Sequence, residues 1–131
     1  MCIRDRGIPI DQRDAFGRHA YGCDICQEVC PWNAQPADPD ESGSPWLPRA
    51  AFDGPTMAQL WRTPDAELRA LLKHSAMARA GVWRLRRNLA VCAGATAAAD
   101  ALSALRDVQE PTCDDPIVAE HIHWALELRG D

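Results

Sequence analysis

The chain has 131 residues, of which 25% are charged and 47% are hydrophobic, and its formal net charge is −5 at pH 7. This composition is typical of a folded globular protein and excludes a disordered one. No apolar run approaches the ~20 residues of a membrane-spanning helix, and residues 1–6 are followed by no apolar segment of the kind found in secretory signals. The sequence therefore predicts a cytoplasmic protein that does not enter a membrane.

The first 55 residues contain a short helix, a cluster of cysteines and a loop. The helix is expected at residues 11–16, ended by Gly17, and three of the six cysteines follow within residues 23–30. Crowded cysteines in a cytoplasmic chain indicate metal binding or redox chemistry more often than disulfides. Residues 34–55 are rich in Pro, Asp, Ser and Gly and show no periodicity, which predicts a linker or a wrapping loop.

From residue 56 onward the sequence predicts helices only. Thr63, Pro64 and Asp65 form a helix-start pattern, with threonine as N-cap and proline in the first helical position, and this helix should end near residue 74. Apolar residues at helical spacing predict further helices at about 81–93, 97–107 and 116–128. The apolar residues expected on the inner faces are Leu68, Leu71, Leu72, Val82, Leu85, Leu89, Cys92, Ala101, Leu102, Leu105, Ile117, Trp124 and Leu128.

These helices suggest a repeat architecture. Helices of this length joined by short loops predict antiparallel helix pairs. The spacing of ~35 residues between the helices that start near 81 and 116 hints at a helical repeat of the HEAT type. Because no strand is expected, the predicted fold class is mostly α.

Residues 21–31 contain the pattern C-x2-C-x3-C-P, formed by Cys23, Cys26 and Cys30. Bacterial ferredoxins carry C-x2-C-x2-C-x3-C-P, in which the fourth cysteine ligates the other cluster of a two-cluster pair. The present chain has the last three of these cysteines, with Ala20 in place of the first. By analogy, Cys23 and Cys26 are predicted to bind one [4Fe–4S] cluster and Cys30 a second.

Three cysteines shared between two clusters leave both incomplete, because each cluster needs four thiolates. The chain is therefore expected to lack ligands that come from another segment. Zinc bound by His19 and the three cysteines is an alternative, and inert thiols are another. Trp32 and Asn33, directly after the pattern, are expected either to shield a cluster and hydrogen-bond its sulfurs or, in the case of Trp32, to pack against the helices.

Three blocks of the sequence resemble the epoxyqueuosine reductase family: RGIPIDQRDAFG, YGCDICQEVCPWN and HSAMARAGVWRLRRNLAVCAGA. The end of the chain, DPIVAEHIHWALEL, is similar to the closing HEAT-like helix of that family. These blocks cover most of the chain outside residues 34–55, and the middle block is the most specific. The chain resembles the C-terminal third of such an enzyme.

The resemblance implies an oxidoreductase in which an external donor passes electrons through two [4Fe–4S] clusters to cobalamin, which removes the epoxide oxygen from a modified guanosine at the wobble position of tRNA. Cobalamin would lie in an N-terminal domain absent here, so this chain alone is expected to be inactive. The protein is expected to be a monomer. It also implies three parts: a partial ferredoxin-like segment (1–33), a linker or wrapping loop (34–55) and a HEAT-like helical domain (56–131). Residues 1–6 depart from the family and are expected to be non-native.

Residues 62–87 carry seven basic and two acidic side chains, a net charge of +5 within an acidic chain. Such a segment is a candidate site for a polyanion, and the resemblance implies the tRNA backbone; a solvated helix face is the alternative. Arg84 and Arg87 are expected opposite the apolar face of their helix, with Arg86 beside it. The residues predicted to contact tRNA are Lys73, Arg79, Arg84, Arg86 and Arg87.

Other titratable residues are expected to be structural. Cys92 falls on an apolar helix face and Cys113 in a turn, so neither is expected to bind a cluster. His121 is expected in the core and His123 at the surface. Two other functions remain open: an electron-transfer module of an unrelated iron–sulfur protein, and a zinc-stabilised helical interaction domain without redox activity.

Overall fold

The structure, a computed structural model, describes residues 7–33, 50–107 and 110–129. Every regular element in these ranges is helical and none is a strand, which confirms the prediction of a mostly α fold. The α-helices are α1 (Ile10–Arg13), α2 (Ile25–Glu28), α3 (Ala50–Asp53), α4 (Met57–Arg62), α5 (Asp65–Leu72), α6 (Gly81–Thr96), α7 (Ala99–Asp107) and α8 (Pro116–Arg129). The 3-10 helices are η1 (Asp14–Phe16), η2 (Pro31–Asn33), η3 (Ala76–Arg79) and η4 (Pro111–Asp114). Within the described ranges, no helix has the length and apolar character needed to cross a membrane.

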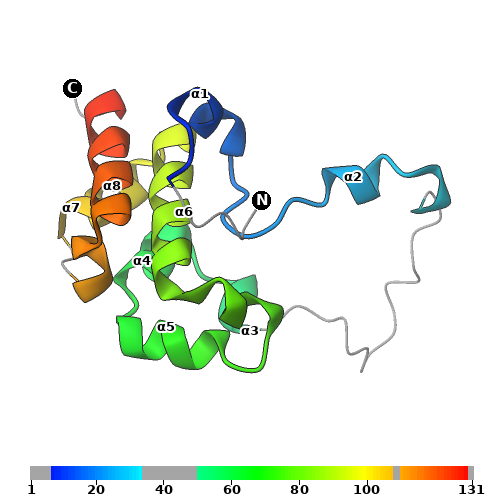
Figure 1. The fold of residues 1–131 in the computed structure, drawn as a ribbon, viewed down its shortest axis with the longest axis horizontal. Helices are drawn as coiled ribbons and strands as arrows, with labels where there is room; N and C mark the ends of the chain where they lie inside the picture. Colours follow the sequence, from blue (N-terminus) through cyan, green and yellow to red (C-terminus); the bar gives the residue numbers. More distant parts are fainter. Residues whose placement is uncertain (1–6, 34–49, 108–109, 130–131) are drawn as a thin grey trace.

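Helix α6 forms the centre of the structure (Figure 1). It makes its most extensive contact with α8 and also touches α1, η1, α4, α5, α7 and η4. By contrast, α2 stands apart from these helices, on the right of the view. The described chain is thus a helical body with one projecting segment, and that segment contains the three clustered cysteines.

The apolar face predicted for α6 is confirmed. Val82, Leu85, Leu89 and Cys92 are each 5% exposed or less. The helix continues past the predicted end to Thr96, and the φ of +52° at Ala97 stops it. Every residue from 85 to 94 is buried. The helix is therefore enclosed on nearly all sides, whereas an amphipathic helix would have one solvated face.

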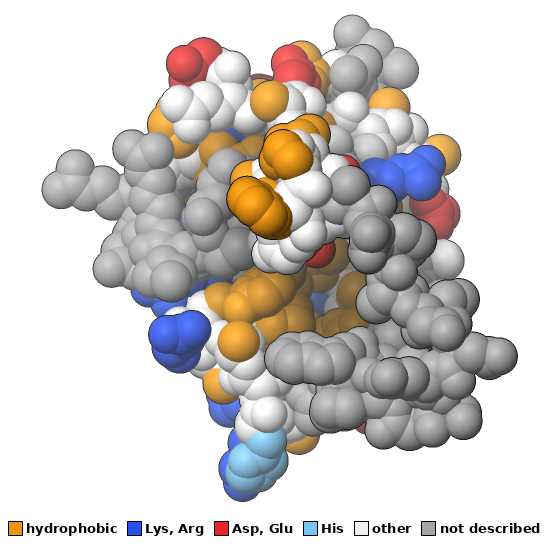
Figure 2. All heavy atoms as spheres, turned by 90° about the vertical axis from the view of Figure 1, so that its right-hand side faces the viewer, with side chains coloured by type: hydrophobic (Ala, Val, Ile, Leu, Met, Phe, Trp, Pro, Cys, Tyr) orange, Lys and Arg blue, Asp and Glu red, His pale blue; other side chains and the backbone are white. Residues whose placement is uncertain are grey.

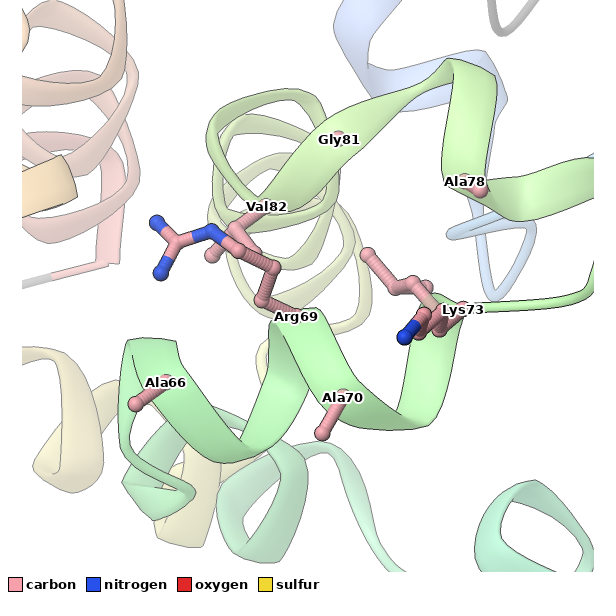
Figure 3. A pocket seen from close by; sticks show the side chains of 8 residues that line it. Ala66, Arg69, Ala70, Lys73, Ala78, Gly81 and Val82 are labelled. Atoms are coloured by element: carbon pink, nitrogen blue, oxygen red, sulfur yellow. The ribbon is translucent and has the colours of Figure 1, made fainter.

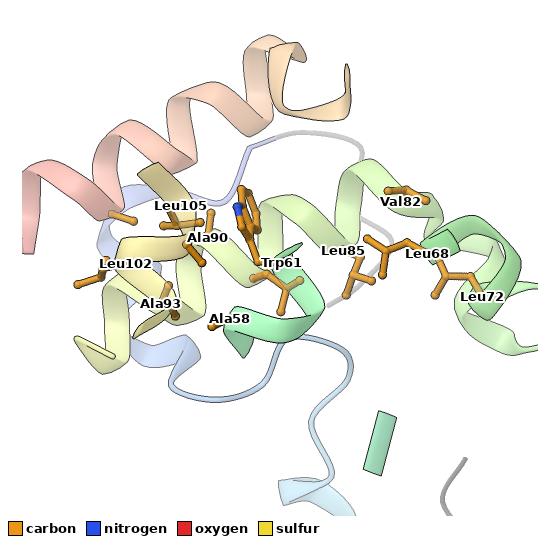
Figure 4. Packing of buried hydrophobic residues seen from close by; sticks show 14 residues of the cluster. Ala58, Trp61, Leu68, Leu72, Val82, Leu85, Ala90, Ala93, Leu102 and Leu105 are labelled. Atoms are coloured by element: carbon orange, nitrogen blue, oxygen red, sulfur yellow. The ribbon is translucent and has the colours of Figure 1, made fainter. Parts of the chain in front are cut away.

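The main hydrophobic core lies between α4, α5, α6 and α7 (Figure 4). Trp61 of α4, Leu68 of α5 and Leu85 of α6 belong to it, together with Ala93 and Leu105. Burying one large apolar side chain contributes roughly 1.5–3 kcal/mol relative to leaving it exposed. This core is the main hydrophobic contribution to the stability of the helical body.

The expected N-cap at Thr63 is wrong. Thr63 instead ends α4, where its hydroxyl donates to the carbonyl of Gln59 at 3.0 Å, and α5 begins at Asp65. The hydroxyl is used by the preceding helix and leaves no cap for the next one. The true capping box belongs to α4: Thr56 Oγ1 accepts from the backbone N–H of Gln59, whose side chain accepts from the Thr56 N–H. Past the end of α5, His74 has a φ of +61°.

The inner face predicted for α8 is wrong for one residue. Leu128 is 47% exposed, whereas Ile117 and Trp124 are half-buried and Trp124 packs against the core. The fully buried residues of α8 are Val118, His121 and Ala125. Helix α8 approaches α6 closely. A Cβ added at Gly94 of α6 would lie 3.0 Å from both Cα and Cβ of Ala125, so only a small residue fits at the contact.

The N-terminal part agrees with prediction except at one point. The helix expected at residues 11–16 corresponds to α1 and η1, and Gly17, with a φ of +50°, ends it. Helix α3, however, lies within residues 34–55, which were expected to be a loop, so that expectation is wrong for Ala50–Asp53. Residues 34–49 lie outside the described residues.

Candidate cluster-binding segment and basic surface

The three clustered cysteines lie around a single helical turn. Cys26 belongs to α2, Cys23 precedes the helix by two residues and Cys30 follows it by two. The turn begins where the carbonyl of Asp24 accepts from the backbone N–H of Gln27 at 2.7 Å, and it ends where the Cys30 N–H donates to the Gln27 carbonyl at 3.2 Å. The C-x2-C spacing thus spans a tight turn, and Cys30 lies beyond it.

The thiols of this segment are available as ligands. All three are free; Cys23 and Cys26 are exposed and Cys30 is half-buried. Unpaired thiols are the donors that iron–sulfur clusters require and that zinc also accepts. In the described ranges, no three His, Cys, Asp or Glu side chains lie together in a way that could hold a metal ion, and His19 is exposed. The chemistry of the donors fits a cluster, but their geometry is not that of a completed site.

Two other cysteines of the described residues are poor ligand candidates. Cys92 is 0% exposed, and burial raises the pKa of its thiol to about 12. Burial also raises the pKa of the half-buried Cys113. Because a metal ligand must be a thiolate, both environments work against ligation, and the predicted burial of Cys92 in the core is confirmed.

An apolar edge runs beside the thiols. Ile25, Val29 and Trp32 are 51%, 73% and 93% exposed. Figure 2 shows the molecule from the side on which α2 projects, and hydrophobic side chains lie together in the part nearest the viewer. This exposure contradicts the alternative that Trp32 packs against the helices. The side chain of Asn33 donates to the Gln27 carbonyl at 3.2 Å, a hydrogen bond within the cysteine segment.

A buried histidine joins the chain before the cysteines to α8. The backbone N–H of Ile8 donates to Nε2 of His121 at 2.9 Å, and Arg13 Nε donates to the Ile8 carbonyl at 2.9 Å. Arg13 Nη2 also donates to both carboxylate oxygens of Glu120 at 2.8 Å. Since Nε2 accepts, the ring proton lies on Nδ1, 2.6 Å from the Ile117 carbonyl. Burial, with the charge of Arg13 adding to it, lowers the pKa of His121; this confirms a core histidine.

Two of the predicted tRNA contacts lie inside the protein. Arg86 and Arg87 are 0% and 1% exposed, so the expectation that Arg87 lies opposite the buried face is wrong. Arg86 donates to Asp65 Oδ1 at 3.1 and 3.0 Å and to the Thr63 carbonyl at 2.7 Å. Arg87 donates to Asn88 Oδ1 at 3.1 and 2.9 Å. The enclosure of α6 on all sides is the physical reason.

The other predicted basic residues lie nearer the surface. Lys73 and Arg79 are exposed, and Arg84 is half-buried, with Nη1 donating to the Ala80 carbonyl at 2.9 Å. Lys73 lines a pocket of about 670 Å³ between α5 and the start of α6, together with Arg69, which the prediction omitted (Figure 3). Arg69 lies on α5 and Lys73 is the residue that directly follows the helix. Their four-residue spacing in the sequence could have indicated that they lie near each other.

His123 is exposed, as predicted. Its Nε2 lies 2.9 Å from Glu127 Oε1, one helical turn further along α8. This is a surface pair of a kind that contributes at most about 1 kcal/mol. No reactive arrangement is formed there by these two side chains.

Comparison with known proteins finds relatives that share one name. The chain is 36% identical over 127 residues to an epoxyqueuosine reductase of Xanthomonas campestris, 36% over 133 residues to one of Pseudomonas aeruginosa and 38% over 120 residues to one of Shewanella oneidensis. These alignments cover 96%, 100% and 91% of the chain but 35%, 36% and 30% of the relatives. No protein-family model and no solved structure matches it. The chain spans about a third of the length of the curated relatives it matches, and over that length it is similar to epoxyqueuosine reductases.

Proposed function

We propose that the chain is the C-terminal part of a tRNA epoxyqueuosine reductase, with cluster ligands for electron transfer to cobalamin and a helical end that contacts tRNA. The observation that carries the proposal is the similarity to reductases of that name along 91–100% of the chain, combined with three free thiols in a ferredoxin-type spacing. The parts are a partial ferredoxin-like segment (1–33), a linker or wrapping loop (34–55) that includes α3 near its end, and a HEAT-like domain (56–131). The packing of α6 along α8 supports the last of these.

In this proposal Cys23 and Cys26 bind one [4Fe–4S] cluster and Cys30 binds the second, with the other ligands supplied by the rest of the enzyme. The clusters, when bound, would carry single electrons from an external donor toward cobalamin held by another domain. The role of this chain is to present the thiols and to limit water at the sulfurs. Trp32 and Asn33 lie directly after Cys30, where side chains can adjust the potential of a cluster through solvent access and hydrogen bonds. The protein acts in the cytoplasm as a monomer.

Anaerobic reconstitution tests the cluster. The chain is incubated with iron and sulfide, and bound iron, sulfide and zinc are measured beside the variants Cys26→Ala and Cys113→Ala. We expect iron and sulfide in near-equal amounts, with visible absorption that is lost in Cys26→Ala and kept in Cys113→Ala, because only the first removes a proposed ligand. Zinc at about one per chain without sulfide, the ratio of one completed four-ligand site, would instead establish the zinc-stabilised interaction domain.

The surface of α5 and η3 is the proposed tRNA contact. Lys73 and Arg79 are exposed and would neutralise phosphates, which supplies affinity without reading sequence. We expect Lys73→Glu with Arg79→Glu to weaken binding of an unmodified tRNA transcript by about tenfold or more and to reduce its salt dependence. Arg62→Glu with Arg106→Glu, an equal charge change on the side of α4 and α7, is the control. Equal weakening by both pairs would show a nonspecific charge effect and favour the electron-transfer module that docks another protein.

A further inference from the structure

Two buried polar side chains of α6 bind the chain just before the cysteines. Asn88 is 3% exposed and Arg87 is 1% exposed. Asn88 Nδ2 donates to the backbone carbonyl of Ala20 at 2.8 Å, across 68 positions of sequence. On its other side, Asn88 Oδ1 accepts from Nε and Nη2 of Arg87 at 3.1 and 2.9 Å. The pair therefore joins the middle of α6 to the start of the cysteine segment.

Arg87 determines which way the Asn88 amide faces. A guanidinium has donors only, so the side-chain oxygen of Asn88 must face it, and the NH2 group must then face Ala20. Arg87 is itself placed by the Trp83 ring, whose centroid lies 5.5 Å from its Cζ. The hydrogen bond to Ala20 is thus oriented by a buried charge, which makes it more specific than an isolated amide contact.

Little chain separates this hydrogen bond from the first thiol. Only Tyr21 and Gly22 stand between Ala20 and Cys23, and a residue spans at most ~3.3–3.6 Å. Gly22 turns the chain there with a φ of +73°. Beyond it, the hydrogen bonds that residues 23–33 form with other described residues all lie within that stretch. The Asn88–Ala20 bond therefore attaches the chain to the helical body three residues before Cys23.

We propose that Asn88, oriented by Arg87, is a positioning residue that fixes where Cys23 and Cys26 stand relative to the helical body and so sets the environment of the cluster they bind. The inference rests on the proposed function. Asn88 touches neither cluster nor thiol; it acts through the Ala20 carbonyl. A cluster held by a loosely attached segment would be more open to solvent, and solvent exposure shifts its reduction potential.

The sharpest variant is Asn88→Asp. The carboxylate is nearly isosteric and keeps an acceptor for Arg87, but it cannot donate to the Ala20 carbonyl. Without metal, we expect amide hydrogen exchange of residues 21–26 to become about tenfold faster or more, since losing a buried hydrogen bond costs at least a factor of that order. In the reconstituted protein, we expect a shifted reduction potential and a changed electron paramagnetic resonance signal.

Two further variants make the test decisive. Thr112→Val removes the hydrogen bonds that the Thr112 hydroxyl donates to Asp65, which do not involve Ala20 or Asn88. It should lower stability while leaving exchange of residues 21–26 and the cluster signals unchanged. Gly22→Ala places a methyl group that meets nothing within 4 Å but strains a φ of +73°. It should shift the same signals even if the Asn88 variants do not fold.

The outcomes separate the inference from the proposed function. If wild type and Asn88→Asp bind iron and sulfide with the same spectra, potential and exchange rates, or if Gly22→Ala leaves the signals of the wild type, the inference is wrong and the proposed function stands. If the wild type binds zinc at about one per chain and no sulfide, the proposed function is wrong and the inference about the cluster falls with it.

Discussion

Replacing Arg86 by alanine should destabilise the protein by about 3–5 kcal/mol, the cost typical of removing one partner from a buried ion pair. Arg86 is 0% exposed and donates to Asp65 and to the backbone carbonyls of Trp61 and Thr63. Its loss would leave a carboxylate and two carbonyls inside the protein with fewer donors. Chemical denaturation monitored by tryptophan fluorescence measures the change, and the exposed Arg69→Ala should change stability by no more than about 0.5 kcal/mol.

The pH dependence of this difference identifies its cause. Burial raises the pKa of Asp65, but hydrogen bonds from Thr112 and Arg86 and the charge of Arg86 outweigh it, so the pKa lies below the ordinary 3.8. A depressed pKa contributes stability above the unfolded value and loses it as the pH falls through the folded value. The difference in the free energy of unfolding between wild type and Arg86→Ala should therefore be largest above about pH 4 and become smaller as the pH falls below it. A gap that is the same at pH 3 and pH 7 would contradict an electrostatic origin.

The second large effect is expected at Gly94, where α6 and α8 meet. A Cβ there would lie 2.7 Å from Cζ3 of Trp124 and 3.0 Å from the backbone and Cβ of Ala125. Alanine is the better helix former by about 1 kcal/mol, yet the overlap requires the two helices to separate. We expect Gly94→Ala to lower the free energy of unfolding by about 1–3 kcal/mol, the range for an overpacked core.

The control for this substitution is Gly54→Ala. A Cβ at Gly54 meets nothing within 4 Å, and its φ is not in the left-handed region. Urea denaturation of both variants separates the packing at Gly94 from the general effect of replacing glycine. If Gly94→Ala proved as stable as the wild type, the close approach of α6 to α8 would be disproved.

The sequence predicts the helices well because helical periodicity is local. The residues expected on the inner faces of α6 and α7 are buried. It fails where distant parts of the chain decide the environment. Arg86 and Arg87 belong to a basic segment and would ordinarily face water, and the acidic partner of Arg86 lies 21 positions earlier in the sequence. In α8 the pattern misses the exposure of Leu128 and the burial of Ala125, since Gly94 of another helix lies against Ala125.

The candidate site also has features that can be predicted from the sequence and features that cannot. The spacing of Cys23, Cys26 and Cys30 follows from one turn of helix and is visible in the sequence. The hydrogen bond from Asn88 to Ala20 is not, since it spans 68 positions and involves a backbone carbonyl, which leaves no trace in side-chain pattern. Nor could the sequence alone distinguish the exposed Lys73 and Arg79 from their buried neighbours.

The enclosure of α6 has a consequence for length variation. Consecutive residues of an α-helix are rotated by about 100°, so Arg86 and Asn88 point to roughly opposite sides of α6, one toward α5 and the other toward the cysteine segment. A residue inserted or deleted within this helix would rotate one of the two attachments away from its partner while the other stayed in register. The angular setting of α6 thus couples the cysteine segment to the helical body, and we expect insertions and deletions to be tolerated in the connections between helices but not within α6.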